Sequence, residues 1–201
     1  PKLIKEYFPA DLVLEATQPT RLWFNMLQIC SAIYLGKSAY KNVFVHGMIS
    51  DYQGEKMSKS LGNVISPEEV LTKYSADVLR YYMCQTTAGE NISFSWEDIK
   101  TKQRNLTILS NLANFIHDLD SLKLEKGTPG IEERWILSKY HSTLKKVTAL
   151  FEEYKIDETI GEIEKLYLSL SREYIQLVRE KSNENDTVRT TVREIYRGIL
   201  K

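Results

Sequence analysis

The 201-residue sequence has few of the residues that mark disulfide-rich, metal-binding or membrane proteins. Its two cysteines, Cys30 and Cys84, lie far apart, with no Cys-x-x-Cys spacing and no Cys/His cluster, so neither a zinc site nor a disulfide framework is indicated. No uninterrupted apolar run approaches the ~18 residues of a membrane span, and no secretory signal peptide is recognisable. We therefore expect a soluble, cytoplasmic protein with reduced thiols and no metal site.

The sequence also lacks an excess of either charge. Lys and Arg together number 27, as do Asp and Glu. Net charge therefore predicts neither a nucleic acid nor a membrane surface as a partner. The 42% hydrophobic content and the length are enough for a buried core in one or two domains.

The first part of the chain alternates between strand and helix patterns. β-Branched and aromatic residues predict strands over residues 10–16 and 42–47, and apolar spacing predicts a helix over 20–35 between them. This order is typical of a βαβ unit with a parallel sheet.

A second helix is expected over residues 67–85, after a loop. Ser66 is placed to cap it, Pro67 occupies the first helical position, and Glu69 completes a capping box. Its apolar face is expected to contain Leu71, Tyr74, Val78 and Tyr82. A polar connector, residues 86–95, follows this helix.

From residue 96 onward apolar residues recur at helical spacing, which predicts a helical bundle. The stripes of the last three helices are Leu137, Tyr140, Leu144, Val147, Phe151 and Tyr154; Ile160, Ile163, Tyr167, Leu170, Tyr174 and Leu177; and Val188, Val192, Ile195 and Ile199. Residues 127–130 and 183–186 are expected as loops, and Asp157 as an N-cap. We place a domain boundary near Ser95, between domains 1–95 and 96–201.

Lys56 and Lys59 are the first candidates for chemistry, because they lie in a Gly-flanked loop between a strand and a capped helix. Mobile ammonium groups there can follow negative charge that develops on phosphate groups in a transition state. A bare Lys-x-x-Lys is also common in solvated surface loops, which is the structural alternative for this pair.

The wider pattern resembles the second signature of class I aminoacyl-tRNA synthetases. It comprises residues 46–48 (His-Gly-Met), 56–63 (Lys-Met-Ser-Lys-Ser-Leu-Gly-Asn) and 74–80 (Tyr-Ser-Ala-Asp-Val-Leu-Arg). The features that select a branch of the class are Glu15, Thr20-Arg21, Trp23-Phe24 and the runs 133–138 and 172–179. Together they most resemble isoleucyl-tRNA synthetases; the valyl, leucyl and methionyl enzymes share the lysine loop and are the alternatives.

The resemblance implies an α/β fold followed by an all-α fold. Residues 1–95 would be the C-terminal part of a Rossmann-like catalytic domain, with the lysine loop and a connecting helix, and residues 96–201 a truncated anticodon-binding-type bundle. It also implies a ligase that activates isoleucine with ATP, bound as its Mg²⁺ complex, to an aminoacyl-adenylate, and then transfers the amino acid to tRNA.

The family's residue roles carry over as expectations. Lys56 and Lys59 would stabilise the phosphates, and Lys59 is the stronger candidate. The residues expected to bind ATP or the adenylate are Glu15, Gln18, His46, Gly47, Met48, Met57 and Ser58. Trp23 would form an apolar wall of the amino-acid pocket. The structural alternatives are a strand-end histidine for His46 and a core-facing helix aromatic for Trp23.

The chain departs from the family pattern at two places. Where the family usually shows Gly, Asp, Gln and Gly, it has Ala16, Gln18, Pro19 and Leu22, and it contains no His-x-Gly-His motif, which supplies the other half of the ATP site in this class. We therefore expect a piece of a longer synthetase, inactive without the N-terminal part of the enzyme. The alternatives are a noncatalytic tRNA-binding or interaction module derived from a synthetase, and an unrelated nucleotide-binding protein with a helical bundle.

Arg189, Arg193, Arg197 and Lys201 recur every four residues, roughly opposite the apolar stripe of the last expected helix. Such a row fits a tRNA backbone, to which each contact adds a salt-dependent term. The alternative is the solvated face of an ordinary amphipathic helix.

Overall fold

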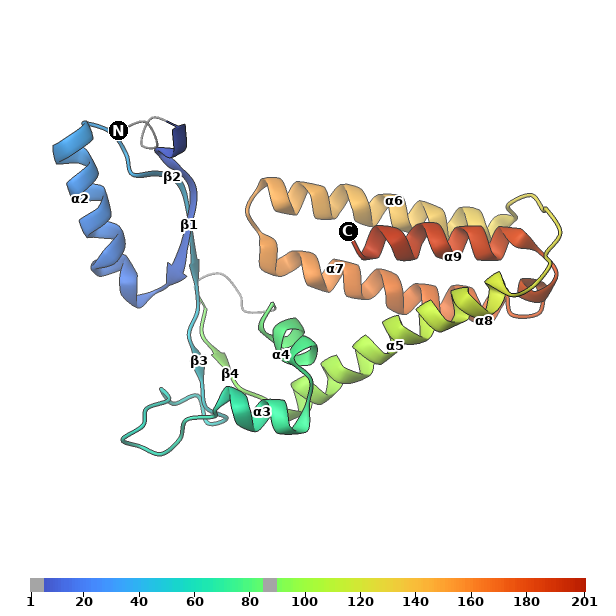
Figure 1. Ribbon diagram of the computed structural model, residues 1–201, viewed down its shortest axis with the longest axis horizontal. Coiled ribbons are helices and arrows are strands. Elements are labelled where there is room, and N and C mark those ends of the chain that lie inside the picture. The colour runs from blue at the N-terminus through green and yellow to red at the C-terminus, as the bar shows by residue number, and fades with distance from the viewer. Residues whose placement is uncertain (1–5, 85–89) are drawn as a thin grey trace. The chain divides into compact units, whose positions relative to one another are not determined.

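The computed structural model describes residues 6–84 and 90–201, apart from the side chain of Pro19, and divides into two units (Figure 1). The first unit comprises Pro1–Lys73 and Thr86–Ser95, and the second Tyr74–Gln85 and Trp96–Lys201. Residues 74–85 thus cluster with the helices of the second unit. The domain boundary near Ser95 stays a prediction.

The first unit is built on a parallel βαβ arrangement, as the sequence pattern predicts. Strands β1 (Ala10–Ala16) and β2 (Tyr40–His46) pair in parallel, from Ala10 opposite Tyr40 to Ala16 opposite His46, and helix α2 (Trp23–Leu35) connects them (Figure 1). Phe24 is buried on α2, and its ring lies 6.0 Å from that of Tyr40. Gly36 ends the helix in the left-handed region, at φ 62°, which glycine adopts without strain.

The connection from β1 to α2 differs from the single helix expected over residues 20–35. A 3-10 turn, η1 (Gln18–Arg21), comes first, and α2 begins only at Trp23. The Thr20 hydroxyl donates to the carbonyl of Thr17 at 2.6 Å. Such a local side-chain bond competes with regular helix and tightens the turn.

A second, very short parallel pair is absent from the sequence prediction. Strands β3 (Ile49–Ser50) and β4 (Ile92–Ser93) pair in register, inside segments that the sequence indicates as loop and polar connector. The Met48 N–H donates to the Asn91 side chain at 2.8 Å at the start of this pair. Two-residue strands lack a recognisable alternation of apolar residues, so pattern analysis misses them. Residues 86–89 of the expected connector lie outside the described residues.

The helix expected over residues 67–85 is broken in two. Helix α3 (Pro67–Lys73) starts as predicted, with Ser66 Oγ accepting from the Glu69 N–H at 3.1 Å, whereas the Glu69 carboxylate contacts Lys73. Ser75 is extended and caps a separate helix, α4 (Ala76–Met83). The predicted apolar face breaks with it: Val78 is buried, but Leu71 is 46% exposed. Gln85 lies outside the described residues.

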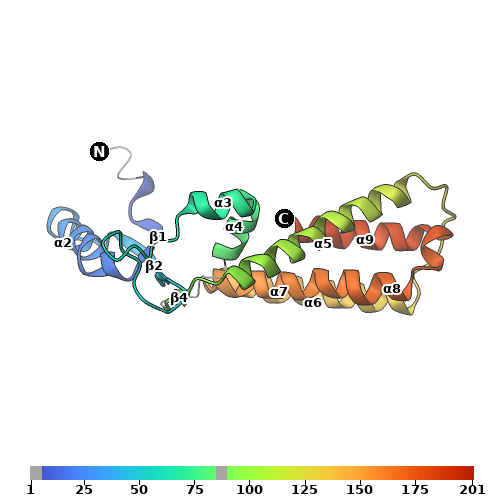
Figure 2. The same cartoon turned by 90° about the horizontal axis from the view of Figure 1, so that it is seen from below.

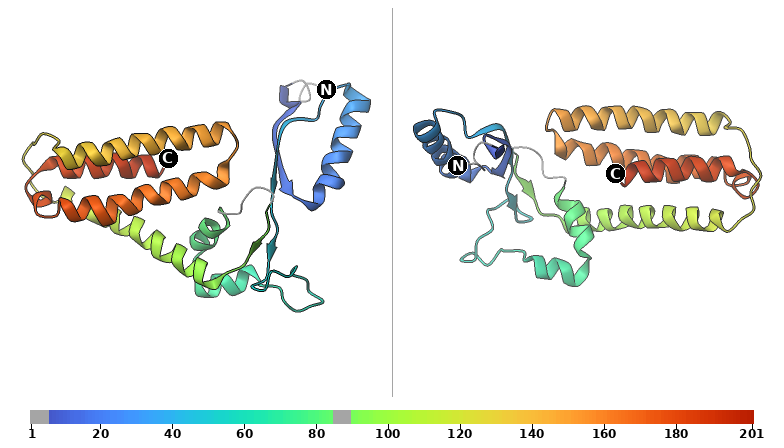
Figure 3. Two further views of the ribbon diagram at one scale, coloured as in Figure 1. Left: turned by 180° about the vertical axis from the view of Figure 1, so that it is seen from behind. Right: turned by 45° about the horizontal axis from the view of Figure 1, so that its top comes forward.

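The second unit is the predicted helical bundle. Its long helices are α5 (Trp96–Asp120), α6 (Ile131–Glu152), α7 (Ile156–Ser169) and α9 (Asp186–Ile199). A π-helical turn η2 (Leu170–Tyr174), the short α8 (Ile175–Leu177) and a 3-10 turn η3 (Lys181–Asn183) continue the chain from α7. Helices α6, α7 and α9 lie side by side in every view (Figure 2, Figure 3).

One apolar core holds these helices together. Its buried members are Leu112, Leu119, Ile136, Leu166, Tyr167, Leu170, Tyr174, Val178, Val188, Val192 and Ile195. Three residues of the expected stripes are instead exposed: Leu144, Phe151 and Leu177. The apolar stripe of α6 therefore continues past the part of the helix that is packed against its neighbours.

The helix starts of the bundle are set by backbone turns as well as by side-chain caps. The prediction that Asp157 is an N-cap is wrong, because α7 already begins at Ile156. The chain leaves α6 through Tyr154, whose φ is 58°. The Asp157 carboxylate instead lies in the first turn, where the helix dipole favours negative charge. Asn185 caps α9 by accepting from the Thr187 N–H at 2.8 Å.

Glu164 on α7 joins three helices through one carboxylate. It accepts hydrogen bonds from Tyr81 at 2.8 Å on α4, and from Lys102 at 2.6 Å and Asn105 at 2.5 Å on α5. Tyr81 also contacts the hydroxyl of Tyr167 at 2.7 Å. The network gives α4 a defined place against the bundle because each polar group in it finds a partner.

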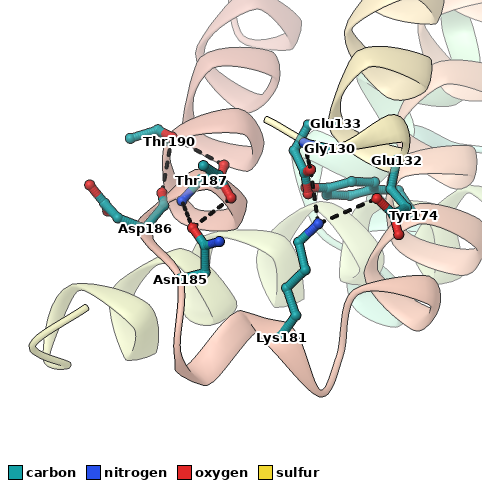
Figure 4. A network of polar contacts seen from close by, with 9 residues as sticks. All are labelled: Gly130, Glu132, Glu133, Tyr174, Lys181, Asn185, Asp186, Thr187 and Thr190. Atoms are coloured by element: carbon teal, nitrogen blue, oxygen red, sulfur yellow. Dashed lines mark hydrogen bonds and ion pairs between the residues drawn. The ribbon is translucent and has the colours of Figure 1, made fainter. Parts of the chain in front are cut away.

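Glu133 at the start of α6 is fully buried and satisfied by three donors (Figure 4). Its carboxylate accepts from the Gly130 N–H at 2.6 Å, from Lys181 at 2.9 Å and from the Tyr174 hydroxyl at 3.0 Å. Burial alone raises the pKa of Glu133, but the Lys181 ammonium and the other two donors outweigh it and hold this pKa below its usual value. The ionised form is thus the one that the fold stabilises.

We expect Glu133→Gln to destabilise the helical unit by about 3 kcal/mol, because it leaves the Lys181 charge without its buried partner. A carboxylate with a lowered folded-state pKa contributes its stability fully above its unfolded pKa of about 4.3 and loses it as the pH falls through the folded value. Urea unfolding followed by circular dichroism should therefore show the difference between wild type and variant at pH 7 and its disappearance under acid conditions.

Glu132→Gln is the matched control, since Glu132 contacts the same ammonium at 3.3 Å but is partly exposed. It should cost no more than about 1 kcal/mol. Equal losses from the two variants would contradict the role given to Glu133.

Candidate functional site

The lysine loop, residues 51–66, is a sequence of tight turns that presents both lysines to solvent. Residue 56 forms an isolated antiparallel bridge with Ser50 at the end of β3, and the Gly62 N–H donates to the carbonyl of Lys59 at 3.3 Å. Gly62 has φ 68°, which favours glycine. Within the described part of the chain, neither ammonium group is paired with a carboxylate. Both charges are therefore available to a ligand.

The backbone of this loop is held by Asp51 and Asn63. Asp51 is 4% exposed; its carboxylate accepts from the backbone N–H groups of Gln53 at 2.9 Å and Glu55 at 2.8 Å, and from the Asn63 side chain at 2.9 Å. The hydrogen bond from Asn63 holds the pKa of Asp51 below its ordinary value, against the opposing effect of burial, and the backbone donors add to it. A side chain that accepts several hydrogen bonds stays ionised at neutral pH.

A cavity of about 280 Å³ opens beside the loop in the first unit. Its described lining residues are Thr17, Gln18, Met48, Ile49, Ser50, Gly54, Lys56, Met57 and Asn91. Lys56 is the one charged residue in this set, and the rest of the lining combines methionine side chains with hydroxyl and amide groups. Apolar side chains beside several hydrogen-bonding groups and one cation suit a flat ring that carries an anionic group.

The cavity brings together four of the residues expected from the sequence: Gln18, Met48, Lys56 and Met57. They come from η1, from the residue before β3 and from the lysine loop. The fold thus brings residues that are distant in the sequence around one cavity.

The other expected residues of this unit lie outside that lining. Glu15 is the second-last residue of β1 and accepts from the Ala16 N–H at 3.1 Å, and the His46 ring donates through Nδ1 to the carbonyl of Gly47 at 2.8 Å. Ser58 Oγ accepts from the Leu61 N–H at 3.2 Å, within the loop. Trp23 is 51% exposed on α2. Lys59 lies in the loop with its side chain exposed.

Several residues of the site were missed by sequence reasoning. Asn91 reaches the cavity from beside β4, and no local pattern connects it to the lysine loop. Asp51 opens a segment ending in Gly54, a composition typical of a turn, and Asn63 directly follows Gly62. These signals predict that the two residues lie in turns, but they do not indicate that the two side chains form a hydrogen bond with each other.

Two of the arginines in the expected basic row on α9 form ion pairs with acidic side chains. Arg189 contacts Asp186, and Arg193 contacts Asp120 at the end of α5. Arg197 is exposed and has no acidic partner within the described residues. Asp120 was not foreseen because it comes from a helix 73 positions earlier, and its charge offsets part of the row.

The described residues contain neither a metal-binding cluster nor a membrane-spanning helix. Across residues 6–84 and 90–201, no group of three or more His, Cys, Asp and Glu side chains is arranged to hold a metal ion. None of the helices in these residues has both the length and the apolar character needed to cross a membrane. Cys30 and Cys84 are both free and exposed.

The chain matches two protein-family models. Residues 2–95 match the tRNA synthetases of class I (I, L, M and V), and residues 133–201 match the anticodon-binding domain of tRNA ligases. Similar proteins include the isoleucine–tRNA ligases of Archaeoglobus fulgidus, 37% identical over 88% of this chain, and of Saccharolobus solfataricus, 38% identical over 89%. The chain spans 18% and 19%, respectively, of the length of these relatives.

Solved structures of synthetases share the fold. The Mycobacterium tuberculosis methionyl-tRNA synthetase in complex with methionyl-adenylate matches 99% of this chain and 42% of its own, with a TM-score of 0.80 and 23% identity. A ternary LeuRS–tRNA–LeuAMS complex from Agrobacterium radiobacter K84 matches 99% of this chain and 26% of its own, with a TM-score of 0.76 and 22% identity.

Gly47 supplies a test of the geometry around the cavity. A Cβ atom added at this residue would overlap the carbonyl of Glu90, which is backbone and cannot rotate away. We expect Gly47→Ala to separate β3 from β4 and to lower hydrogen-exchange protection of the Ile92 and Phe94 amides by about tenfold or more, since overpacking costs about 1–3 kcal/mol.

The matched control is Gly161→Ala in α7, where an added Cβ meets nothing within 4 Å. It should leave the protection of both amides unchanged. Normal protection in Gly47→Ala, measured by mass spectrometry, would show that Gly47 does not set the approach of the two strands.

Proposed function

Because the chain belongs to the class I tRNA synthetases of the I, L, M and V group and contains the end of the catalytic domain and the anticodon-binding region, we propose that it is part of an isoleucine–tRNA ligase. The enzyme would activate isoleucine with ATP and transfer it to tRNA. The observation that carries this proposal is the cavity beside the lysine loop, where Lys56 is the one cation among polar and apolar groups. The isoleucine–tRNA ligases among its relatives favour this branch over the leucyl, valyl and methionyl ones.

In the proposed first step, a carboxylate oxygen of isoleucine attacks the α-phosphorus of ATP. The bond from that phosphorus to the oxygen bridging to the β-phosphate breaks, and pyrophosphate leaves with the extra negative charge. Lys56, at the cavity wall, and Lys59, exposed in the same loop, would neutralise this charge as it develops. Mg²⁺ enters as part of the ATP complex.

The remaining site residues take supporting roles in the proposal. Met48 and Met57 would form the apolar wall for the adenine ring, and Gln18 would hydrogen-bond a ribose hydroxyl. Glu15, His46, Gly47 and Ser58, which lie near the strand ends and in the loop, would complete the binding of ATP and the adenylate, and Trp23 would border the amino-acid pocket. The other half of the ATP site is expected in the N-terminal part of the same enzyme.

We expect Lys59→Ala in the complete enzyme to lower ATP–pyrophosphate exchange about 10²- to 10³-fold, because one charge that stabilises the leaving group is lost. The affinity for tRNA should stay within about twofold, since the loop acts in adenylate formation. The measurements are isotope exchange at saturating isoleucine and filter binding of the tRNA.

Lys37→Ala is the control, because Lys37 is an exposed lysine of the first unit outside the cavity lining. It should leave both measurements unchanged. A parallel loss of exchange and tRNA affinity in Lys59→Ala would argue that the lysine only maintains the fold.

The exposed end of α9 is the proposed tRNA contact, with Arg197 as its main free charge and Arg189 and Arg193 as charges shared with Asp120. Arg197→Ala should weaken tRNA binding and lower the slope of log affinity against log salt by about one, as expected for one lost phosphate contact. Lys165→Ala, which removes an exposed lysine already paired with Glu162, is the control and should change neither quantity. An unchanged salt slope in Arg197→Ala would remove this helix from the tRNA surface.

A further inference from the structure

One side-chain amide connects three points of the lysine loop. Asn63 Oδ1 accepts from the Ser58 N–H at 2.9 Å, while its Nδ2 donates to the Asp51 carboxylate at 2.9 Å and to the carbonyl of Lys56 at 3.2 Å. The bonds to residues 56 and 58 fix the backbone on both sides of Met57. The conformation of the segment between the two lysines therefore depends on this amide.

Asp51 connects the same segment to the sheet. It directly follows Ser50, which pairs with Ser93 through β3 and β4 and bridges to residue 56. Its N–H donates to the carbonyl of Glu55 at 2.9 Å, so the turn that leads into the loop is closed by both its backbone and its side chain. The start of the lysine loop is therefore held in place by the strand pair β3–β4.

The hydrogen-bonding groups around Asp51 and Asn63 are fully matched only when residue 51 carries the carboxylate and residue 63 the amide. Asp51 faces three donors, and a carboxylate is the side chain that accepts from all of them. Asn63 faces one donor and two acceptors, which its amide satisfies and which an aspartate would not. Neither side chain lines the cavity, so neither is placed to touch a bound ligand.

We propose that Asp51 and Asn63 are positioning residues that hold the backbone between Lys56 and Lys59 in the conformation from which both ammonium groups reach the leaving phosphates. This inference rests on the proposed function. The pair is expected to affect stabilisation of the transition state rather than binding of ATP. The reason is that Lys56 and Lys59, which the pair orients, act when charge develops on the leaving group. Loss of the pair should thus lower kcat more than it raises the KM for ATP.

The test uses the complete enzyme with Asp51→Asn, Asn63→Asp, and the double exchange that carries both substitutions. Each single change places two amides or two carboxylates opposite each other across the 2.9 Å contact. It should lower kcat for ATP–pyrophosphate exchange by about tenfold or more, as expected for the loss of a partly buried hydrogen bond to a charge. Trypsin cleavage after Lys56 and Lys59 should accelerate by a similar factor. In the double exchange the amide of residue 51 donates to the carboxylate of residue 63, so both readouts should recover in part.

Asn42→Ala is the matched control, since Asn42 lies on β2 and its side chain donates to the carbonyl of Asp11 on β1 at 3.0 Å. It should leave exchange and loop cleavage unchanged. In a Lys56→Ala, Lys59→Ala background, Asn63→Asp should have little further effect on exchange, because the charges that it orients are already absent.

Single variants with wild-type cleavage and kcat would overturn the proposal, and so would an undiminished effect of Asn63→Asp in the background without lysines. An increase in the KM for ATP with unchanged kcat would also overturn it, because the pair would then act on binding. If the wild-type enzyme shows no pyrophosphate exchange, the proposed function fails, and the cleavage measurements still decide whether the pair orders the loop.

Discussion

A carboxylate that is withdrawn from water must be matched by donors, and three buried or largely buried carboxylates lie at the points where separate segments of this chain meet. Asp51 joins the short sheet to the lysine loop, Glu133 joins the start of α6 to the segment after α8, and Glu164 joins α4 and α5 to α7. The apolar core brings the helices together without fixing their ends. The acids do so, because their donors are satisfied in one arrangement only.

The lysine loop combines a fixed backbone with free charges. Its turns are closed by Asp51 and Asn63, whereas Lys56 and Lys59 extend into solvent without acidic partners in the described chain. The opposite holds for the row on α9, where Arg189 and Arg193 are already engaged by acids. This difference supports the proposal that the loop acts on a highly charged leaving group, whereas the row on α9 offers a weaker, partly neutralised surface.

Sequence reasoning succeeded where the signal is local or strongly periodic. The parallel βαβ unit, the helical bundle, the Ser66 cap and the family membership all follow from spacing or from an uninterrupted motif. It failed where a single residue overrides the pattern. Ser75 is extended and divides a helix that its apolar spacing would continue, and the backbone at Tyr154 starts α7 earlier than Asp157 suggests. Caps and turns of this kind depend on energies of about 1 kcal/mol, which the apolar pattern does not report.

The class of each part of the chain and the lysine loop can be recognised from the sequence alone, because periodicity and a contiguous motif are properties of neighbouring residues. The meeting of distant groups is set by the three-dimensional fold: Gln18, Met57 and Asn91 line one cavity, Asp120 contacts Arg193, and Asp51 contacts Asn63. These contacts form when sheet pairing and helix packing bring remote segments together. They depend on the whole arrangement of each unit, and no local stretch of sequence contains them.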